Sequence, residues 1–173
     1  MTLGIRAAGP ADRDFVLATV RRLGDFGPPP WRTAEEIGEA DARVLRVFFE
    51  RPAPGAALLV AEETGTALGF VYLEAVRDFF DGREHGHVSV LAVARAAEGR
   101  GVAGALMRAA EDWARERGYA RLTLNVFEGN ARARAVYAHL AYRPETVRYI
   151  KFLDENGRAG DALAPRLKGS SGR

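Results

Sequence analysis

Closely spaced glycines at a strand-to-helix joint limit the fold of this chain more than any other feature. Gly99, Gly101 and Gly104 follow an apolar run over residues 87–93, and they open a segment, residues 101–117, with apolar side chains at helical spacing. Glycine lets a backbone bend tightly and approach a ligand closely, and the unpaired N–H groups of a first helical turn favour an anion. The spacing predicts a cradle for a phosphate or pyrophosphate; a tight loop without a ligand is the alternative.

Two other phosphate-binding motifs fit these glycines less well. Gly99-x-Gly101-x-x-Gly104 matches the dinucleotide fingerprint, but that motif should follow its strand at once, whereas five residues separate Val93 from Gly99. The lysine of an ATP-binding P-loop does not follow Gly104. A dinucleotide-dependent oxidoreductase is therefore a distant alternative.

The rest of the chain alternates strand and helix signals. Thr33 and Glu36 form a capping box ahead of an amphipathic helix, and other helices are predicted after Pro10 and from Asn130. The predicted strands are residues 3–7, 56–63, 67–77, 87–93, 121–126 and 146–153, with a turn at 63–66 and a polar loop at 78–86. The order β-α-α-β-β-β-α-β-α-β predicts one α/β domain over residues 3–153, followed by a disordered tail over residues 154–173.

Composition excludes several classes of chemistry and partner. The 173 residues include no Cys, which excludes disulfides, Cys-ligated metals and a cysteine nucleophile, and the three His form no metal-binding pattern. A net charge of +2 is small for a nucleic-acid binder. No apolar run approaches the roughly 18 residues of a membrane span, and no signal peptide is visible at the start. We expect a cytoplasmic protein with no nucleic-acid, membrane or metal partner.

Two motifs resemble those of the GCN5-related N-acetyltransferase (GNAT) family. Residues 93–106 (VARAAEGRGVAGAL) resemble its acetyl-CoA-binding motif, Gln/Arg-x-x-Gly-x-Gly/Ala, with Glu98 in place of the Gln or Arg. Asn130, Ala133 and Tyr137 match its second signature, in which Ala141 replaces the usual Gly. The resemblance covers about residues 3–153 and implies a mixed, mostly antiparallel central sheet with splayed fourth and fifth strands and flanking helices.

The resemblance also implies the co-substrate, acetyl-CoA, and the residues that bind it. In this family the pantetheine arm lies between the splayed strands. Backbone groups of Leu91, Ala92 and Val93 would contact the arm, and the Leu91 N–H would polarise the thioester carbonyl. The pyrophosphate would be held by Gly99, Arg100, Gly101, Val102, Ala103 and Gly104, and the arm would also touch Asn130 and Ala133.

Direct attack of an amine on a thioester needs a neutral amine and an acid for the departing thiolate. By resemblance, Tyr137 is the acid; a core aromatic at helical spacing is the alternative. His87 lies where some family members carry a catalytic Glu, so it is a candidate base, with a solvated histidine as the alternative. Glu84, His85 and Ser89 lie close to His87 in sequence, while Glu74 sits on the facing third strand.

The resemblance thus implies an N-acetyltransferase acting on a primary amine of a small molecule, peptide or protein. The alternative is a catalytically silent acyl-CoA-binding regulatory module, favoured by Glu98 and by the lack of an obvious carboxylate base on the fourth strand. Loops carrying Trp31, Phe79 and Phe80 often line the acceptor pocket in this family, although peripheral packing explains them as well. Family members commonly form dimers, which leaves a homodimer open.

Overall fold

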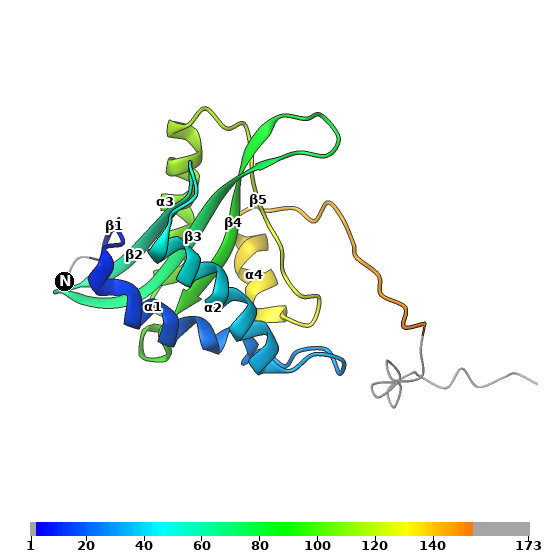
Figure 1. The fold of residues 1–173 in the computed structure, drawn as a ribbon, viewed down its shortest axis with the longest axis horizontal. Helices are drawn as coiled ribbons and strands as arrows, with labels where there is room; N and C mark the ends of the chain where they lie inside the picture. The colour runs from blue at the N-terminus through cyan, green and yellow to red at the C-terminus, as the bar shows by residue number, and fades with distance from the viewer. Residues whose placement is uncertain (1–2, 154–173) are drawn as a thin grey trace, which may run out of the picture.

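The computed structural model describes residues 3–153, which form one sheet with helices on both faces (Figure 1). The strands are β1 (Gly4–Ala7), β2 (Ala57–Glu63), β3 (Thr66–Arg77), β4 (Glu84–Val93) and β5 (Leu122–Leu124). The α-helices are α1 (Arg13–Val20), α2 (Ala34–Glu50), α3 (Val102–Glu116) and α4 (Ala131–His139). Short 3-10 helices are η1 (Pro10–Asp12), η2 (Arg21–Gly24) and η3 (Arg95–Ala97).

The strands lie in the order β1-β2-β3-β4-β5, and every neighbouring pair is antiparallel except β4 with β5. The parallel pairing of β4 with β5 covers only the register from Gly86↔Leu122 to Val88↔Leu124. Beyond Val88, β4 continues for five residues without a ladder to β5. The structure therefore confirms the predicted mixed sheet with splayed fourth and fifth strands.

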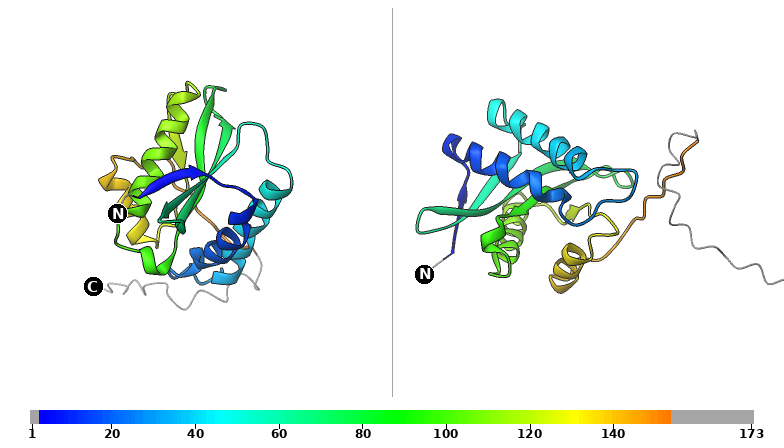
Figure 2. Two further views of the ribbon diagram at one scale, coloured as in Figure 1. Left: turned by 90° about the vertical axis from the view of Figure 1, so that its left-hand side faces the viewer. Right: turned by 90° about the horizontal axis from the view of Figure 1, so that it is seen from below.

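Helices cover the two faces of the sheet in pairs, with α1 and α2 on one side and α3 and α4 on the other (Figure 2). Val16 and Leu45, from α1 and α2, pack with Phe70 of the sheet in one apolar cluster, and Met107 of α3 packs with Leu73 of the sheet in a second. The helices α1, α2 and α3 each bury one apolar stripe, which accounts for their predicted periodicity, whereas α4 has no fully buried residue. No helix of residues 3–153 combines the length and the apolar character that crossing a membrane requires.

Local signals in the sequence form as predicted. The Thr33 hydroxyl accepts from the Glu36 N–H at 3.0 Å, while the Glu36 carboxylate accepts from the Thr33 N–H at 2.7 Å, so the capping box is complete. Thr64 and Gly65 both have positive φ, as a two-residue hairpin turn requires, and they join β2 to β3. Gly118, with φ +72°, follows the C-cap residue of α3.

The predicted last strand, residues 146–153, is wrong for the structure described here. These residues form no strand, and their apolar side chains are open to solvent, with Tyr149 and Leu153 each 90% exposed. The apolar alternation is present, but the segment runs away from the sheet instead of pairing with it (Figure 1). The predicted loop 78–86 is also too long, because β4 already begins at Glu84. The predicted tail, residues 154–173, lies outside the described residues.

Candidate active site

The glycine turn has the conformation that its sequence predicts. Gly99 and Gly101 adopt φ values of +75° and +77°, a left-handed backbone that side chains with a Cβ rarely enter, and Gly101 caps the N-terminus of α3. A Cβ atom on Gly99 or Gly101 would meet nothing within 4 Å, and one on Gly104 would meet only a guanidinium nitrogen of Arg108, at 3.4 Å. The outer side of the turn is therefore open.

The start of α3 presents free donors to this open side. Its first backbone bond joins the Ala105 N–H to the Gly101 carbonyl at 3.1 Å, so the preceding N–H groups, up to Gly104, have no acceptor within the helix. Val102 is buried in the α3 cluster and fixes this end of the helix against the sheet. Gly69 on β3 allows that close approach, because a Cβ there would lie 2.8 Å from the Ala92 carbonyl oxygen. The turn thus has the open space and the free N–H groups that an anion-binding site requires.

Glu98, the residue that departs from the family motif, binds two arginines. Its carboxylate accepts from Arg22 of η2 at 2.6 Å and from Arg132 of α4 at 2.7 Å. The hydrogen bond from Arg22, followed by that from Arg132, lowers the pKa of Glu98 to about 2. Glu98 therefore links η2, the glycine turn and α4, a role that the motif comparison did not predict.

The arginines that the sequence gathers around the turn are partly neutralised. Residues 95–134 contain eight Arg and five acids. Arg100 contacts Glu63 at 2.5 Å, and Arg95 contacts Asp25 at 3.3 Å. Each ion pair joins two segments that are far apart in the sequence. Both pairs are exposed, and such pairs contribute little to stability. The local field is therefore weaker than the arginine count suggests.

The C-terminal half of β4 is the edge on which the sequence predicts contacts with pantetheine. Ala92 is buried and Leu91 and Val93 are half-buried, all three paired with β3 on one side only. The Val93 carbonyl accepts from Arg22 at 2.7 Å. Since β5 has separated from β4 at this point, the strand edge facing β5 is available for an extended ligand.

The start of α4 lies beside the turn, because Arg132 contacts Glu98 at 2.7 Å. The Asn130 side chain accepts from the Ala133 N–H at 3.1 Å and caps the helix, so the capping interpretation of Asn130 is correct, and a ligand contact is compatible with it. Tyr137 packs against the α3 cluster, with its ring edge toward Tyr142 at 6.1 Å between centroids. Burial raises the pKa of the Tyr137 phenol, which keeps it protonated and able to act as an acid.

A polar cluster occupies the other face of the sheet, where β4 and β5 begin to separate. Glu74 of β3 stands opposite His87 of β4 and accepts hydrogen bonds from Tyr72, at 3.1 Å, and from Ser89. Ser89 is the extra residue of a β-bulge, because the neighbouring pairs are Tyr72↔Val90 and Leu73↔Val88. The bulge brings Ser89 and the predicted candidate His87 to the same carboxylate.

Thr123 of β5 completes this cluster and was not predicted from sequence. Its hydroxyl lies 2.8 Å from His87 Nδ1 and 3.1 Å from His85 Nε2. Burial lowers the pKa of His87, and the nearby His85 lowers it further while Glu74 opposes the effect. Both effects favour the neutral form of His87. Only the β4–β5 register identifies Thr123, since His87 and Thr123 are far apart in the chain.

Asp41 is a second residue that sequence reasoning missed. It lies one helical turn from both Ile37 and Leu45, which are buried members of the apolar stripe of α2, and it is itself half-buried. Burial raises the pKa of Asp41. A carboxylate at a stripe position is the signal that could have identified it.

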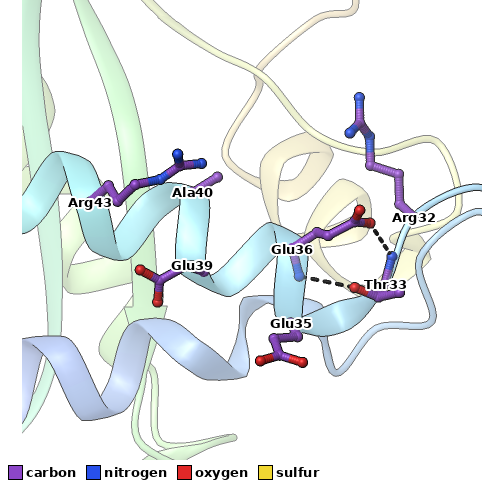
Figure 3. Close-up of a pocket in the computed structure, with 7 residues that line it drawn as sticks. All are labelled: Arg32, Thr33, Glu35, Glu36, Glu39, Ala40 and Arg43. Carbon is purple, nitrogen blue, oxygen red and sulfur yellow. Dashed lines mark hydrogen bonds between the residues drawn. The ribbon is translucent and has the colours of Figure 1, made fainter.

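The aromatic side chains in the loops expected to line an acceptor pocket are exposed. Phe79 and Phe80 are 92% and 78% exposed at the β3–β4 connection, and Trp31 packs edge-on against Phe152 at 5.8 Å. A shallow hollow lies over α2 and the loop before it (Figure 3). Its lining residues are Arg32, Thr33, Glu35, Glu36, Glu39, Ala40 and Arg43. None belongs to the glycine turn or to β4, so this hollow is not part of the candidate site.

The structure combines an open glycine turn with a parallel strand pair that separates beside it. The family model described as "Acetyltransferase (GNAT) family" matches residues 22–142, so the chain belongs to this family. The match includes the turn, the β4 edge and α4, on which the predicted residues lie.

Individual relatives agree with this assignment. Mycothiol acetyltransferase of Amycolatopsis mediterranei is 33% identical over 139 residues, which cover 78% of this chain and 44% of the relative, so the chain spans less than half of that protein. A GCN5-related N-acetyltransferase from Ralstonia eutropha superposes with a TM-score of 0.67 at 22% identity, covering 87% of this chain and 99% of its own. The aminoglycoside N-acetyltransferase AAC(6')-Iy, solved with CoA, gives 0.64 at 20% identity, covering 89% and 95%. These structures show the shared fold.

Proposed function

We propose that residues 3–153 form an N-acetyltransferase domain that transfers the acetyl group of acetyl-CoA directly to a primary amine. The observation that carries this proposal is the open turn at Gly99 and Gly101, whose left-handed glycines lead into free N–H groups of α3. A pyrophosphate fits such a site, because the donors are backbone groups and the helix dipole favours the anion. Family membership supports the same ligand.

The predicted binding residues would each act through the backbone or a short side chain. The pyrophosphate would lie on residues 99–104, and the pantetheine arm would run along residues 91–93 toward Asn130 and Ala133. Within this path the Leu91 N–H would polarise the thioester carbonyl. The splay between β4 and β5 would let the thioester reach both Tyr137 on one side and the polar cluster around His87 on the other.

The transfer would proceed in balanced steps. The polar cluster takes one proton from the acceptor ammonium, and the neutral amine forms a C–N bond to the thioester carbonyl carbon. The C–S bond then breaks as Tyr137 gives its phenolic proton to the CoA thiolate, and the second proton of the nitrogen restores the Tyr137 phenol, while the proton held by the polar cluster passes to solvent. The products are an N-acetyl amide and CoA thiol.

The experiment is a thiol-release assay with acetyl-CoA and a panel of amines that includes amino sugars, polyamines and peptides with free N-termini. The wild-type chain should release CoA with at least one amine, and Tyr137→Phe should lower kcat by about 10²-fold or more. Tyr119→Phe is a matched control, because Tyr119 packs on Trp113 of α3 and lies outside the proposed path. Equal rates for the two variants would contradict the acid role of Tyr137.

A catalytically silent acyl-CoA-binding module is the second candidate, favoured by the acidic Glu98 in the binding motif. Such a module would bind acetyl-CoA, release no thiol with any amine, and be indifferent to Tyr137→Phe. The same assay therefore separates the two functions.

A further inference from the structure

The hydroxyl of Thr123 lies within hydrogen-bond distance of three groups but has only one proton to donate. This limits where the protons of the neighbouring histidines can be. It lies 2.8 Å from His87 Nδ1, 3.1 Å from His85 Nε2 and 3.4 Å from the Gly86 carbonyl oxygen. A hydroxyl has one proton to donate and two lone pairs, and a neutral imidazole has one N–H and one bare nitrogen. Only a few proton arrangements satisfy all three groups.

The buried end of His85 selects among these arrangements. His85 is 5% exposed, and its Nδ1 is buried without a hydrogen-bond partner among the described residues. A buried N–H without an acceptor is rarer and more costly than an unused lone pair. His85 therefore leaves Nδ1 bare and carries its proton on Nε2, which donates to Thr123.

Thr123, having accepted from His85, can donate its own proton to one group. His87 Nδ1 at 2.8 Å is within normal hydrogen-bond range, whereas the Gly86 carbonyl at 3.4 Å is too distant for a strong bond. The hydroxyl proton thus points at His87 Nδ1, which must be bare. A neutral His87 then carries its proton on Nε2 and has no free lone pair with which to accept another.

Glu74 is the group in this cluster that keeps free lone pairs. An ionised carboxylate has about four acceptor sites. Two of them are used, by Tyr72 and Ser89, both of which only donate to it. The carboxylate therefore keeps acceptor sites free, on a residue that pairs with His87 in the β3–β4 register.

We infer that His85 and Thr123 hold His87 as the Nε2–H tautomer, and that Glu74, rather than His87, takes the proton of the acceptor amine. In this arrangement Glu74–COO⁻ becomes Glu74–COOH as the ammonium becomes a neutral amine, and the carboxyl proton later passes to solvent. His87 is a positioning residue that donates from Nε2. This inference rests on the proposed function only for the role of Glu74; the tautomer stands independently.

Several charged or titratable groups share this face and set the pH response. They are Glu74 and Tyr72 on β3 and His85 on β4; Asp41 lies on α2, the helix that packs against this side of the sheet, but it is not among the charges that shift the pKa of His87. Thr123 on β5 does not titrate. A base on the enzyme predicts that kcat/KM falls at acidic pH, and variants identify the residue that is responsible.

The first test is side-chain ¹⁵N NMR of the full chain, which contains only three histidines. Assigned by comparison with His87→Gln, the His87 signals should show a bare Nδ1 and a protonated Nε2 at pH 7. In Thr123→Val this preference should disappear, and in Thr123→Ser, which keeps the hydroxyl, it should persist. A protonated Nδ1 in the wild-type chain would overturn the tautomer, whatever the enzyme activity.

The second test is the pH dependence of kcat/KM with the amine found by the thiol-release assay. Glu74→Gln should lower kcat/KM by about 10²-fold or more and remove the acidic limb. His87→Gln, whose amide can still donate, should lower it less than about tenfold and keep the limb. Equal losses, with the limb removed by His87→Gln, would show that His87 is the base.

Two controls keep these outcomes interpretable. Acetyl-CoA affinity should match the wild type in every variant and each variant should be folded at the assay temperature by its melting curve, and Glu74→Asp, which retains the carboxylate, should keep the acidic limb at a reduced rate. If acetyl-CoA binds but no amine reacts even with the wild type, the proposed function fails while the NMR result still decides the tautomer.

Discussion

Ala141 ends α4 in a conformation that suits glycine. Its φ is +65°, and it stands at the C′ position of a Schellman motif in which the Tyr142 N–H donates to the Tyr137 carbonyl at 2.9 Å and the Ala141 N–H to the Ala138 carbonyl at 3.0 Å. The left-handed backbone costs a residue with a Cβ about 1–2 kcal/mol. The family motif has glycine at this position, so the strain follows from a single substitution.

Ala141→Gly should therefore stabilise the chain. The relief of strain exceeds the entropy cost of glycine, which leaves about 0.5–1 kcal/mol, measured as the free energy of unfolding in urea. Ala135→Gly, on the exposed middle of the same helix, should instead destabilise by roughly 0.5–1 kcal/mol. A loss of stability in Ala141→Gly would mean that the packing of Tyr137 and Tyr142 depends on the alanine methyl group.

Local sequence signals predicted individual residues well where the partner is a near neighbour. Thr33 finds Glu36 three residues on, and Asn130 caps Ala133 at the same distance. The cluster at His87 could not be completed in this way, because Thr123 reaches it only through the β4–β5 register and Ser89 only through a bulge. Long-range register has no signature in the spacing of residues along one segment.

At the scale of elements, Glu98 joins three segments that border the glycine turn. Its partners Arg22 and Arg132 lie on η2 and α4, far away in sequence. The motif comparison identified Glu98 as a departure from the Gln or Arg of the family motif. It could not show which arginines bind the Glu98 carboxylate, because they come from distant parts of the chain.

Glu98→Gln should lower the melting temperature at pH 7 by only roughly 1–3 °C, because exposed ion pairs contribute little. The folded pKa of Glu98, about 2, lies below its ordinary value of 4.5. Its stabilisation is therefore complete above pH 4.5 and is lost as the pH falls toward 2. Melting curves of both proteins against pH check this: the difference should shrink across that window, and a difference that stays constant to pH 2 would exclude an electrostatic origin.

The strand elements show which patterns a sequence can predict. The hairpin at Thr64 and Gly65 and the helix after Gly101 carry their own turn and capping residues, so both were predicted correctly. Residues 146–153 alternate as a strand does, yet pairing needs a partner edge that alternation cannot specify. Strand-like composition predicts extended backbone more securely than it predicts membership of a sheet.

At the scale of the whole molecule, the splay between β4 and β5 connects the two halves of the candidate site. The anion cradle lies at the start of α3, Tyr137 packs with the α3 cluster, and His87 and Glu74 lie on the face covered by α1 and α2. Only a ligand that enters between the strands reaches all of them. The candidate site as a whole therefore depends on acetyl-CoA binding at the glycine turn.

Calorimetric titration of acetyl-CoA into the wild type, Ala103→Asp and Ala109→Asp tests this claim most directly. An acid in the first turn of α3 interacts favourably with the helix dipole, so Ala103→Asp without ligand should melt no lower than the wild type. The added carboxylate should nevertheless weaken acetyl-CoA binding about tenfold or more, because it repels the pyrophosphate. Ala109→Asp adds the same charge six residues further along the helix and should leave the affinity within about twofold. No binding by the wild type, or equal affinity in all three proteins, would contradict the account.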